Sequence, residues 1–273
     1  MKKQWKKLIA VATVVVMILT GCGQDATEGT HILGQGQSDF DYVKSKETFV
    51  VGITDFAPMD YRDGENWTGF DAQLAETFAK SIGLPLKFVE IDWDKKTELL
   101  ENGTIDCIWN GMTMTEELQE NITCSAPYLS NAQVLVLRSS ERERYKTAES
   151  CQHMLFAVEA GSTGEALLKE QKYRYTSYST QMEALKSVHE KETDVAVIDI
   201  IMAAYYTGNG HEFSDLGFDI SLNDERICVG LRKNSDLVDK VNEFFQSLYK
   251  DGTMKSLADR YGIKSALLEF EEK

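Results

Sequence analysis

The stretch Asp106–Leu137, DCIWNGMTMTEELQENITCSAPYLSNAQVLVL, predicts a strand, a polar turn, a short helix and a second strand. The apolar run at its start ends in Asn110-Gly111, a pair typical of turns. Thr115 precedes two glutamates, as expected of an N-cap residue followed by acids in the first helical turn. Ligands often bind at such strand-to-helix connections, because free backbone N–H groups converge there and glycine allows close approach. An ordinary connection without a ligand is the alternative.

The segments on either side of this stretch alternate between strand and helix patterns. Strands are predicted by apolar runs at residues 49–53, 86–91, 105–109, 155–158, 173–176, 193–199 and 229–233. Helices are predicted by apolar spacing at residues 72–82, 92–100, 165–170, 181–190, 200–206, 236–250 and 254–261. This order is typical of an α/β fold in which helices cover mainly parallel sheets.

The composition describes an acidic globular chain of 273 residues, of which 42% are hydrophobic. It carries 29 basic and 44 acidic residues, a net charge of −15. Without the four lysines among the first seven residues the balance is 25 against 44, or −19. Such a surface argues against a nucleic-acid partner, which needs a basic face. Its field favours cationic solutes, although acidity common to exported proteins explains the charge equally well.

The N-terminus predicts export and a membrane anchor. A basic start is followed by the apolar run Leu8–Leu19, which is too short to span a bilayer. The run leads into Leu-Thr-Gly-Cys22, which resembles a bacterial lipobox and implies cleavage before Cys22 and a lipid on its thiol. We therefore expect a signal peptide over residues 1–21, a lipidated cysteine with a flexible tether over 22–47, and location on the outer face of a bacterial cell membrane.

The other four cysteines, Cys107, Cys124, Cys151 and Cys228, match no zinc or redox spacing. They allow two disulfides in three possible connectivities, or four free thiols. No metal site or cofactor is predicted.

Several ordered motifs resemble one protein family. WNGMTMTEE followed by SAPY is similar to the GMTIT-x-E-R and F-S-x-P-Y signature of the amino-acid-type solute-binding proteins, the extracytoplasmic receptors of ABC importers. The resemblance runs from about Phe49 to Gly262 and is carried also by VGITDFAPM, TGFDAQLAETFAKSIG, EIDWDKKTELLENGTID and the final LADRYG.

The resemblance implies a type II periplasmic-binding-protein-like fold with two lobes. Each lobe is expected to hold a mainly parallel sheet flanked by helices. Residues 48–137 would form the first lobe, residues 138–228 the second, and residues 229–273 would return to the first. Two crossovers near residues 138 and 228 would form a hinge that closes on the ligand.

The resemblance also implies ligand-binding residues in the first lobe. Phe56 matches an aromatic residue that stacks on the ligand, and a core aromatic is the alternative. Asn110, Gly111 and Thr113 match a polar turn that donates hydrogen bonds to the ligand. Asp55 is a further candidate, for which capping of a turn is the alternative.

Four residues of the second lobe complete the predicted site. Ser162 and Thr163 lie in a Gly-Ser-Thr motif that opens a helix, where the N-terminus favours a carboxylate; N-capping is the alternative. Asp199 ends an apolar strand and matches an aspartate that pairs with the ligand's ammonium, or else it caps the next helix. Glu159 stands where relatives carry an uncharged residue and indicates an acidic pocket.

One departure concerns the arginine that holds the ligand's carboxylate in the family through a bidentate pair. The matching position is Leu118, and no basic residue is near it in the sequence. Arg138, Arg226 or Arg232 could substitute only if the fold brings one of them to the cleft.

We therefore expect the substrate-binding lipoprotein of an ABC importer, a monomer that captures an amino acid or related amine by hinge closure and delivers it to permease subunits. The binding is non-covalent, with no catalytic residue. The alternatives are a ligand-sensing or adaptor protein without transport, and a dehydratase on the same fold, for which Glu159 would be the one unusual pocket carboxylate.

Overall fold

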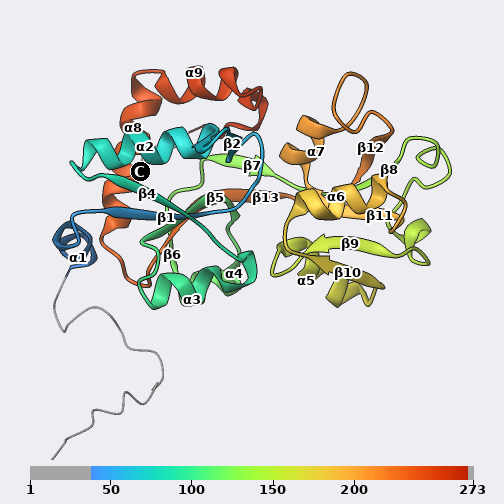
Figure 1. The fold of residues 1–273 in the computed structure, drawn as a ribbon, viewed down its shortest axis with the longest axis horizontal. Helices are drawn as coiled ribbons and strands as arrows, with labels where there is room; N and C mark the ends of the chain where they lie inside the picture. Colours follow the sequence, from blue (N-terminus) through green and yellow to red (C-terminus); the bar gives the residue numbers. More distant parts are fainter. Residues whose placement is uncertain (1–37, 270–273) are drawn as a thin grey trace, which may run out of the picture. The chain divides into compact units, whose positions relative to one another are not determined.

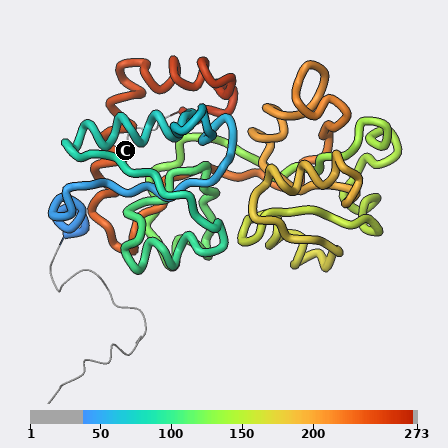
Figure 2. Tube along the Cα trace, viewed as in Figure 1, coloured from blue at the N-terminus to red at the C-terminus, as the bar shows by residue number. Residues whose placement is uncertain are grey.

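The structure, a computed structural model, describes residues 38–269 and contains two larger sheets and one small hairpin (Figures 1 and 2). The first sheet has the order β4 (Leu86–Glu90), β1 (Phe49–Ile53), β5 (Cys107–Thr113), β13 (Glu225–Leu231) and β6 (Thr123–Cys124), with β7 (Leu129–Asn131) also paired to β13. The second has the order β10 (Tyr175–Tyr178), β9 (Phe156–Glu159), β11 (Val195–Asp199), β8 (Gln133–Arg138) and β12 (Leu216–Ser221). The hairpin pairs β2 (Tyr61–Asp63) with β3 (Asn66–Thr68).

Helices cover both sheets, as the alternating sequence pattern predicts (Figure 1). In the first lobe these are α1 (Asp39–Ser45), α2 (Phe70–Ser81), α3 (Lys96–Glu101), α4 (Glu116–Asn121), α8 (Leu237–Lys250) and α9 (Thr253–Arg260). In the second they are α5 (Thr163–Gln171), α6 (Gln181–His189) and α7 (Ile200–Tyr206). Short 3₁₀ turns occur at η1 (Trp93–Lys95), η2 (Glu149–Cys151) and η3 (Lys264–Ala266). The predicted α/β class and the two lobes are confirmed.

Both sheets are mixed. In the first, β1 pairs in parallel with β4 and β5, while β13 runs antiparallel to β5, β6 and β7. In the second, β9 pairs in parallel with β10 and β11, while β8 runs antiparallel to β11 and β12. The antiparallel strands β8 and β13 are the ones that the chain enters immediately after it changes sheet.

The two connections between the sheets lie a few residues earlier than the predicted boundaries at 138 and 228. One is at Ala132, between β7 and β8, and the other is at residues 222–224, between β12 and β13. β8 therefore pairs in the second sheet, and β13 is already part of the first. An apolar run marks a buried strand but does not show which sheet it joins, so the sequence misplaced both crossings.

The core of the first lobe is rich in aromatic rings. Trp109 on β5 contacts Phe78 of α2 and Phe245 of α8 at ring-centroid distances of 5.7 Å each. Tyr128 contacts Phe245 at 5.1 Å. Each such ring buries a large apolar area, and an aromatic pair adds about 0.5–1.5 kcal/mol. The apolar stripe predicted for residues 236–250 is confirmed, because α8 turns it toward this core.

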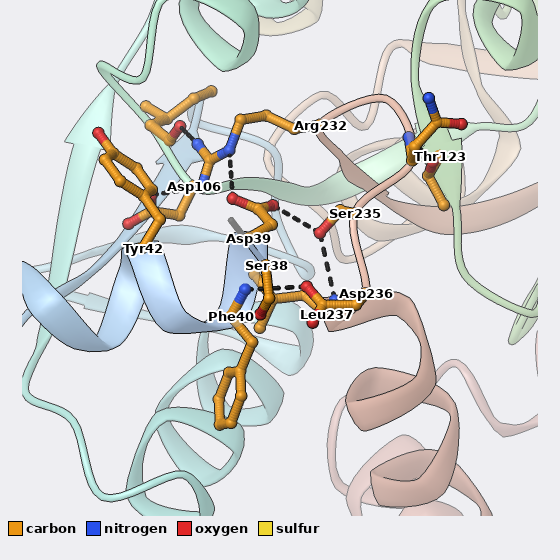
Figure 3. A network of polar contacts seen from close by, with 12 residues as sticks. Ser38, Asp39, Phe40, Tyr42, Asp106, Thr123, Arg232, Ser235, Asp236 and Leu237 are labelled. Atoms are coloured by element: carbon orange, nitrogen blue, oxygen red, sulfur yellow. Dashed lines mark hydrogen bonds and ion pairs between the residues drawn. The ribbon is translucent and has the colours of Figure 1, made fainter. Parts of the chain in front are cut away.

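The predicted flexible tether ends earlier than residue 47, because residues 39–45 form α1. Ser38 caps this helix by accepting the N–H of Asp41. Asp39 is buried and accepts Arg232 Nε at 2.7 Å, while Arg232 Nη2 donates to Asp106 at 2.8 Å (Figure 3). An ion pair between residues so far apart in the sequence leaves no local signal, so composition alone assigned this segment to the tether.

The predicted signal peptide, Cys22 and most of the predicted tether lie outside the described residues. Within residues 38–269, no helix is long and apolar enough to cross a membrane.

Candidate functional site

One cavity is lined by residues from both lobes. All nine residues that the sequence predicts for ligand binding line this cavity: Asp55, Phe56, Asn110, Gly111, Thr113, Glu159, Ser162, Thr163 and Asp199. The structure therefore brings the predicted site together from segments far apart in the sequence. Eight further residues complete the wall: Thr54, Trp93, Lys96, Met112, Leu118, Gly161, Gln133 and Gln181.

The first-lobe wall is formed by a bulge in β5. The turn predicted at Asn110-Gly111 is not a chain reversal, because β5 continues to Thr113 and its register with β13 shifts at this point. Gly111 has a φ of +57°, a left-handed backbone conformation that residues other than glycine rarely adopt. Its N–H donates to Asp71 Oδ2 at 2.7 Å, and the Asn110 side chain accepts the N–H of Thr54. Bulges commonly redirect side chains near functional sites.

Phe56 both belongs to the core and lines the cavity. Its side chain is 4% exposed and belongs to the main hydrophobic cluster of the described residues. Its ring lies against Gly111, where an added β-carbon would be 2.2 Å from Phe56 Cε1. Asp55 beside it is half-buried, and burial raises the pKa of its carboxyl, with Glu90 adding to that effect.

Thr115 is confirmed as the N-cap of α4, since its side chain accepts the N–H of Leu118 at 3.1 Å. Ser162 has the same role at α5. Its hydroxyl accepts the N–H of Glu165 at 3.1 Å and donates to the Glu159 carbonyl at 2.8 Å. The N-capping alternative for Ser162 is therefore confirmed, and its hydroxyl proton is used within the second lobe.

Glu225 connects the predicted residues of the two lobes. Thr113 of the first lobe donates to Glu225 Oε2 at 2.9 Å, and Thr163 of the second donates to Oε1 at 2.7 Å. Asn131 donates to Oε2 at 2.8 Å and Gln133 at 3.1 Å. The carboxylate of Glu225 thus links both lobes at the first residue of β13, and the sequence reading missed it.

Asp199 occupies the N-cap position of α7, but its side chain makes no capping hydrogen bond. Its carboxylate instead accepts side-chain amide donors from Asn131, Gln133 and Gln181. Burial raises its pKa to about 7, and the nearby charge of Glu225 contributes in the same direction. Asp199 is therefore a buried acid at the cavity that is close to half-ionised at neutral pH.

Glu159 is a second buried acid at the end of β9, 4% exposed. Burial and, to a smaller extent, the charge of Asp199 raise its pKa to about 8, while Lys96 opposes the shift. Two buried acids with raised pKa values in one cavity are typical of a functional site.

Among the described residues, Lys96 is the one basic residue that lines the cavity. It comes from the first turn of α3, is 7% exposed, and donates to the carbonyl of Gly161 in the second lobe at 2.9 Å. Arg138, Arg226 and Arg232 do not line it. Leu118 is part of the wall, so the departure from the family signature lies within the site.

No group of three or more His, Cys, Asp or Glu residues within 38–269 could hold a metal ion. The four cysteines of this part of the chain are free, which answers the question the sequence left open between disulfides and thiols.

The residues that sequence reading missed carry weak signals. Gln133 and Gln181 are polar residues at the start of an apolar strand and of a helix, where they resemble ordinary boundaries. Lys96 follows Trp93 in a segment rich in charge and looks like an exposed lysine. Glu225 precedes an apolar strand, and only the fold brings it near Thr113 and Thr163.

Two α/β lobes joined twice around a polar cavity define a type II periplasmic binding protein. Residues 49–264 match the bacterial extracellular solute-binding proteins, family 3, and the chain belongs to this family.

Individual proteins of known ligand are similar to this chain in sequence or in structure. The arginine-binding extracellular protein ArtP of Bacillus subtilis is 23% identical, over 95% of this chain and 98% of ArtP. The L-cystine-binding protein TcyJ of Escherichia coli is 25% identical, over 80% of this chain and 84% of TcyJ. An ABC uptake transporter substrate-binding protein from Streptococcus pneumoniae, solved with bound histidine, is 30% identical, covers 86% of this chain and 100% of its own, and has a TM-score of 0.79.

Proposed function

We propose that the protein is the substrate-binding lipoprotein of an ABC importer and that it captures a small amino acid or related amine between its lobes. The observation that carries this proposal is the single cavity lined by all nine predicted residues, with two buried acids at its wall. Family membership supports it, as do the ligands for which the relatives are named or with which they were solved, which are arginine, cystine and histidine.

The ligand's ammonium binds at Asp199, whose carboxylate is already oriented by three amide side chains. An ammonium beside it supplies the positive charge that a buried carboxylate lacks. Glu159 adds a second buried carboxyl group to the same cavity. Phe56 and Trp93 supply the aromatic part of the lining, which suits the apolar part of the ligand.

Closure of the lobes removes the ligand from water and strengthens each of these polar contacts. Thr113 and Thr163 meet at Glu225 in this arrangement, so the carboxylate of Glu225 holds the two lobes together around the site. The closed form then docks on permease subunits as a monomer, and the ligand leaves unchanged.

The proposal extends to the N-terminus. Residues 1–21 act as a signal peptide, Cys22 carries the lipid, and the segment up to α1 tethers the receptor to the outer face of the membrane. The sequence motif Leu-Thr-Gly-Cys22 supports this part. Mass spectrometry of the membrane-extracted protein tests it: a diacylglyceryl mass on Cys22 is expected, and an unmodified Cys22 would contradict it.

A thermal-shift screen tests the ligand class. The purified protein is heated with L-arginine, L-histidine, L-cystine, their decarboxylated amines, and sugars as controls. Ligand at 100 times its dissociation constant stabilises the folded state by about 2.7 kcal/mol and raises the unfolding midpoint. We expect at least one amino acid or amine to raise it. A shift with sugars only, or with no compound, would contradict the proposal.

A further inference from the structure

Lys96 places a buried ammonium at the cavity without an anionic partner. Its Nζ donates to the carbonyl of Trp93 at 3.1 Å and to the carbonyl of Gly161 at 2.9 Å. No carboxylate among residues 38–269 lies within ion-pair distance of it. An ammonium has three N–H donors, so one is left for another acceptor.

A buried charge of this kind is costly unless it is paired and hydrogen-bonded. The two carbonyls and the face of Trp93, 4.7 Å from Nζ, supply dipoles but no negative charge. The acids that influence Lys96 are Glu159, Asp94 and Glu117, all beyond ion-pair distance. Asp94 and Glu117 are exposed and therefore screened by water.

Glu159 is the buried member of these three acids, and it does not neutralise the charge of Lys96. Its own burial raises its pKa to about 8, so it is largely protonated at pH 7. Burial in turn lowers the pKa of Lys96 to about 8, which keeps most of its ammonium charged at that pH. Lys96 therefore brings a mostly charged ammonium to the cavity, and no carboxylate of residues 38–269 forms an ion pair with it.

Lys96 and Asp199 bring side chains of opposite charge to the cavity. Both line the same cavity, Lys96 from α3 of the first lobe and Asp199 from β11 of the second. A ligand that bears an ammonium and a carboxylate can therefore present each group to a residue of opposite charge. The remaining polar wall near Lys96 includes Ser162 and Thr163 at the N-terminus of α5, where backbone N–H groups also favour an anion.

We infer that Lys96 binds the carboxylate of the ligand and selects carboxylate-bearing amines over amines that lack the group. This inference rests on the proposed function and names the residue that sets its specificity. Because Lys96 Nζ already contacts Gly161 of the other lobe, a carboxylate bound there also joins the two lobes.

The test compares amino acids with their decarboxylated counterparts. Isothermal titration calorimetry at pH 7 measures the full-length protein with L-arginine and agmatine, and with L-histidine and histamine. If Lys96 donates a hydrogen bond to the ligand's carboxylate, the wild-type protein should bind the amino acid about 10- to 100-fold more tightly than the corresponding amine. In Lys96→Met we expect that ratio to fall to about 1, because the amino acid loses the partner of its carboxylate and the amine does not.

Lys95→Met is the matched control, since Lys95 is the neighbouring exposed lysine and does not line the cavity. It should keep the wild-type ratio. Lys96→Arg retains the positive charge and should keep a preference for the amino acid. If Lys96→Met does not fold, Lys96→Arg is measured in its place. Equal affinities of Lys96→Arg for the amino acid and the amine would then overturn the inference.

The outcomes separate the two proposals. If Lys96→Met keeps the wild-type preference for the amino acid, the Lys96 inference is wrong and the solute-binding function stands. If the wild-type protein binds the amine as tightly as the amino acid, the inference is also wrong, and capture of an amine stands. If the wild-type protein binds none of the compounds in these tests or in the thermal-shift screen, both proposals fail.

Discussion

Gly111 and Phe56 are packed so closely that a β-carbon on Gly111 would lie 2.2 Å from Phe56 Cε1 and 2.8 Å from Cδ1. The contact joins the bulge of β5 to the loop after β1, and both residues line the cavity. Gly111 also needs its positive φ of +57° so that its N–H reaches Asp71. Two separate constraints, space and backbone conformation, thus require glycine at this position.

Gly111→Ala should therefore reduce both stability and ligand affinity. The strained conformation costs about 1–3 kcal/mol, and displacement of the Phe56 ring should distort the cavity. Gly64→Ala is the matched control, because Gly64 has φ +64° but no atom within 4 Å of its added β-carbon. Urea unfolding and calorimetry measure the two quantities. Equal losses in both variants, with affinity unchanged, would contradict the packing argument.

Asp199→Asn should greatly weaken or abolish the binding of ammonium ligands. Removing one partner of a buried charge pair costs about 2–5 kcal/mol, which is roughly 30-fold or more in affinity. Calorimetry at pH 7.5 with the tightest ligand from the thermal-shift screen measures the loss. Asp63→Asn, a change at an exposed aspartate of the hairpin, serves as the control. Unchanged affinity in Asp199→Asn would show that the second lobe is wrongly assigned.

The raised pKa of Glu159 predicts that stability depends on pH. Burial raises its pKa in the folded protein to about 8 from the ordinary glutamate value of 4.5. Because the folded protein holds the proton of Glu159 more tightly than the unfolded chain, the protonated group contributes to the free energy of unfolding. This contribution is complete below about pH 4.5 and is lost as the pH rises through about 8. Glu159→Gln mimics the neutral acid, so the variant should gain stability relative to wild type as the pH rises from 5 to 8.

Denaturant unfolding of wild type and Glu159→Gln at pH 5 and pH 8 measures this gain, which we expect to exceed about 1 kcal/mol at pH 8. Glu116→Gln, at an exposed position of α4, should show no such trend. A constant difference between wild type and Glu159→Gln across this range would mean that Glu159 is ionised throughout.

Much of the fold and of the candidate site could be predicted from the sequence, because several features depend on residue types close together in the chain. Thr115 as a cap and the apolar stripe of α8 follow directly from residue types at fixed spacing. The bulge at Gly111 is different, since Asn-Gly also occurs in turns and only pairing with β13 distinguishes the two. Lys96 and Glu225 depend on contacts between distant segments, which no local pattern encodes.

Arg232→Ala should strongly destabilise the first lobe. The guanidinium is 4% exposed and is shared between Asp39 and Asp106 (Figure 3). Its removal leaves the buried Asp39 without an ion-pair partner and leaves Asp106 with Lys46 alone. Breaking a buried pair in this way costs about 3–5 kcal/mol. Lys80→Ala removes the exposed pair with Glu76 and should cost less than about 1 kcal/mol. Urea unfolding compares them, and similar losses would contradict the assigned role of α1 in the fold.

The most direct test of the central claim is a crystal structure of the protein with its tightest-binding amino acid or amine. The account predicts ligand density in the cavity between Phe56 and Asp199, with the ammonium within hydrogen-bond distance of the Asp199 carboxylate and the two lobes joined through Glu225. Ligand density at any other place, or a ligand in the cavity whose ammonium does not contact Asp199, would contradict it.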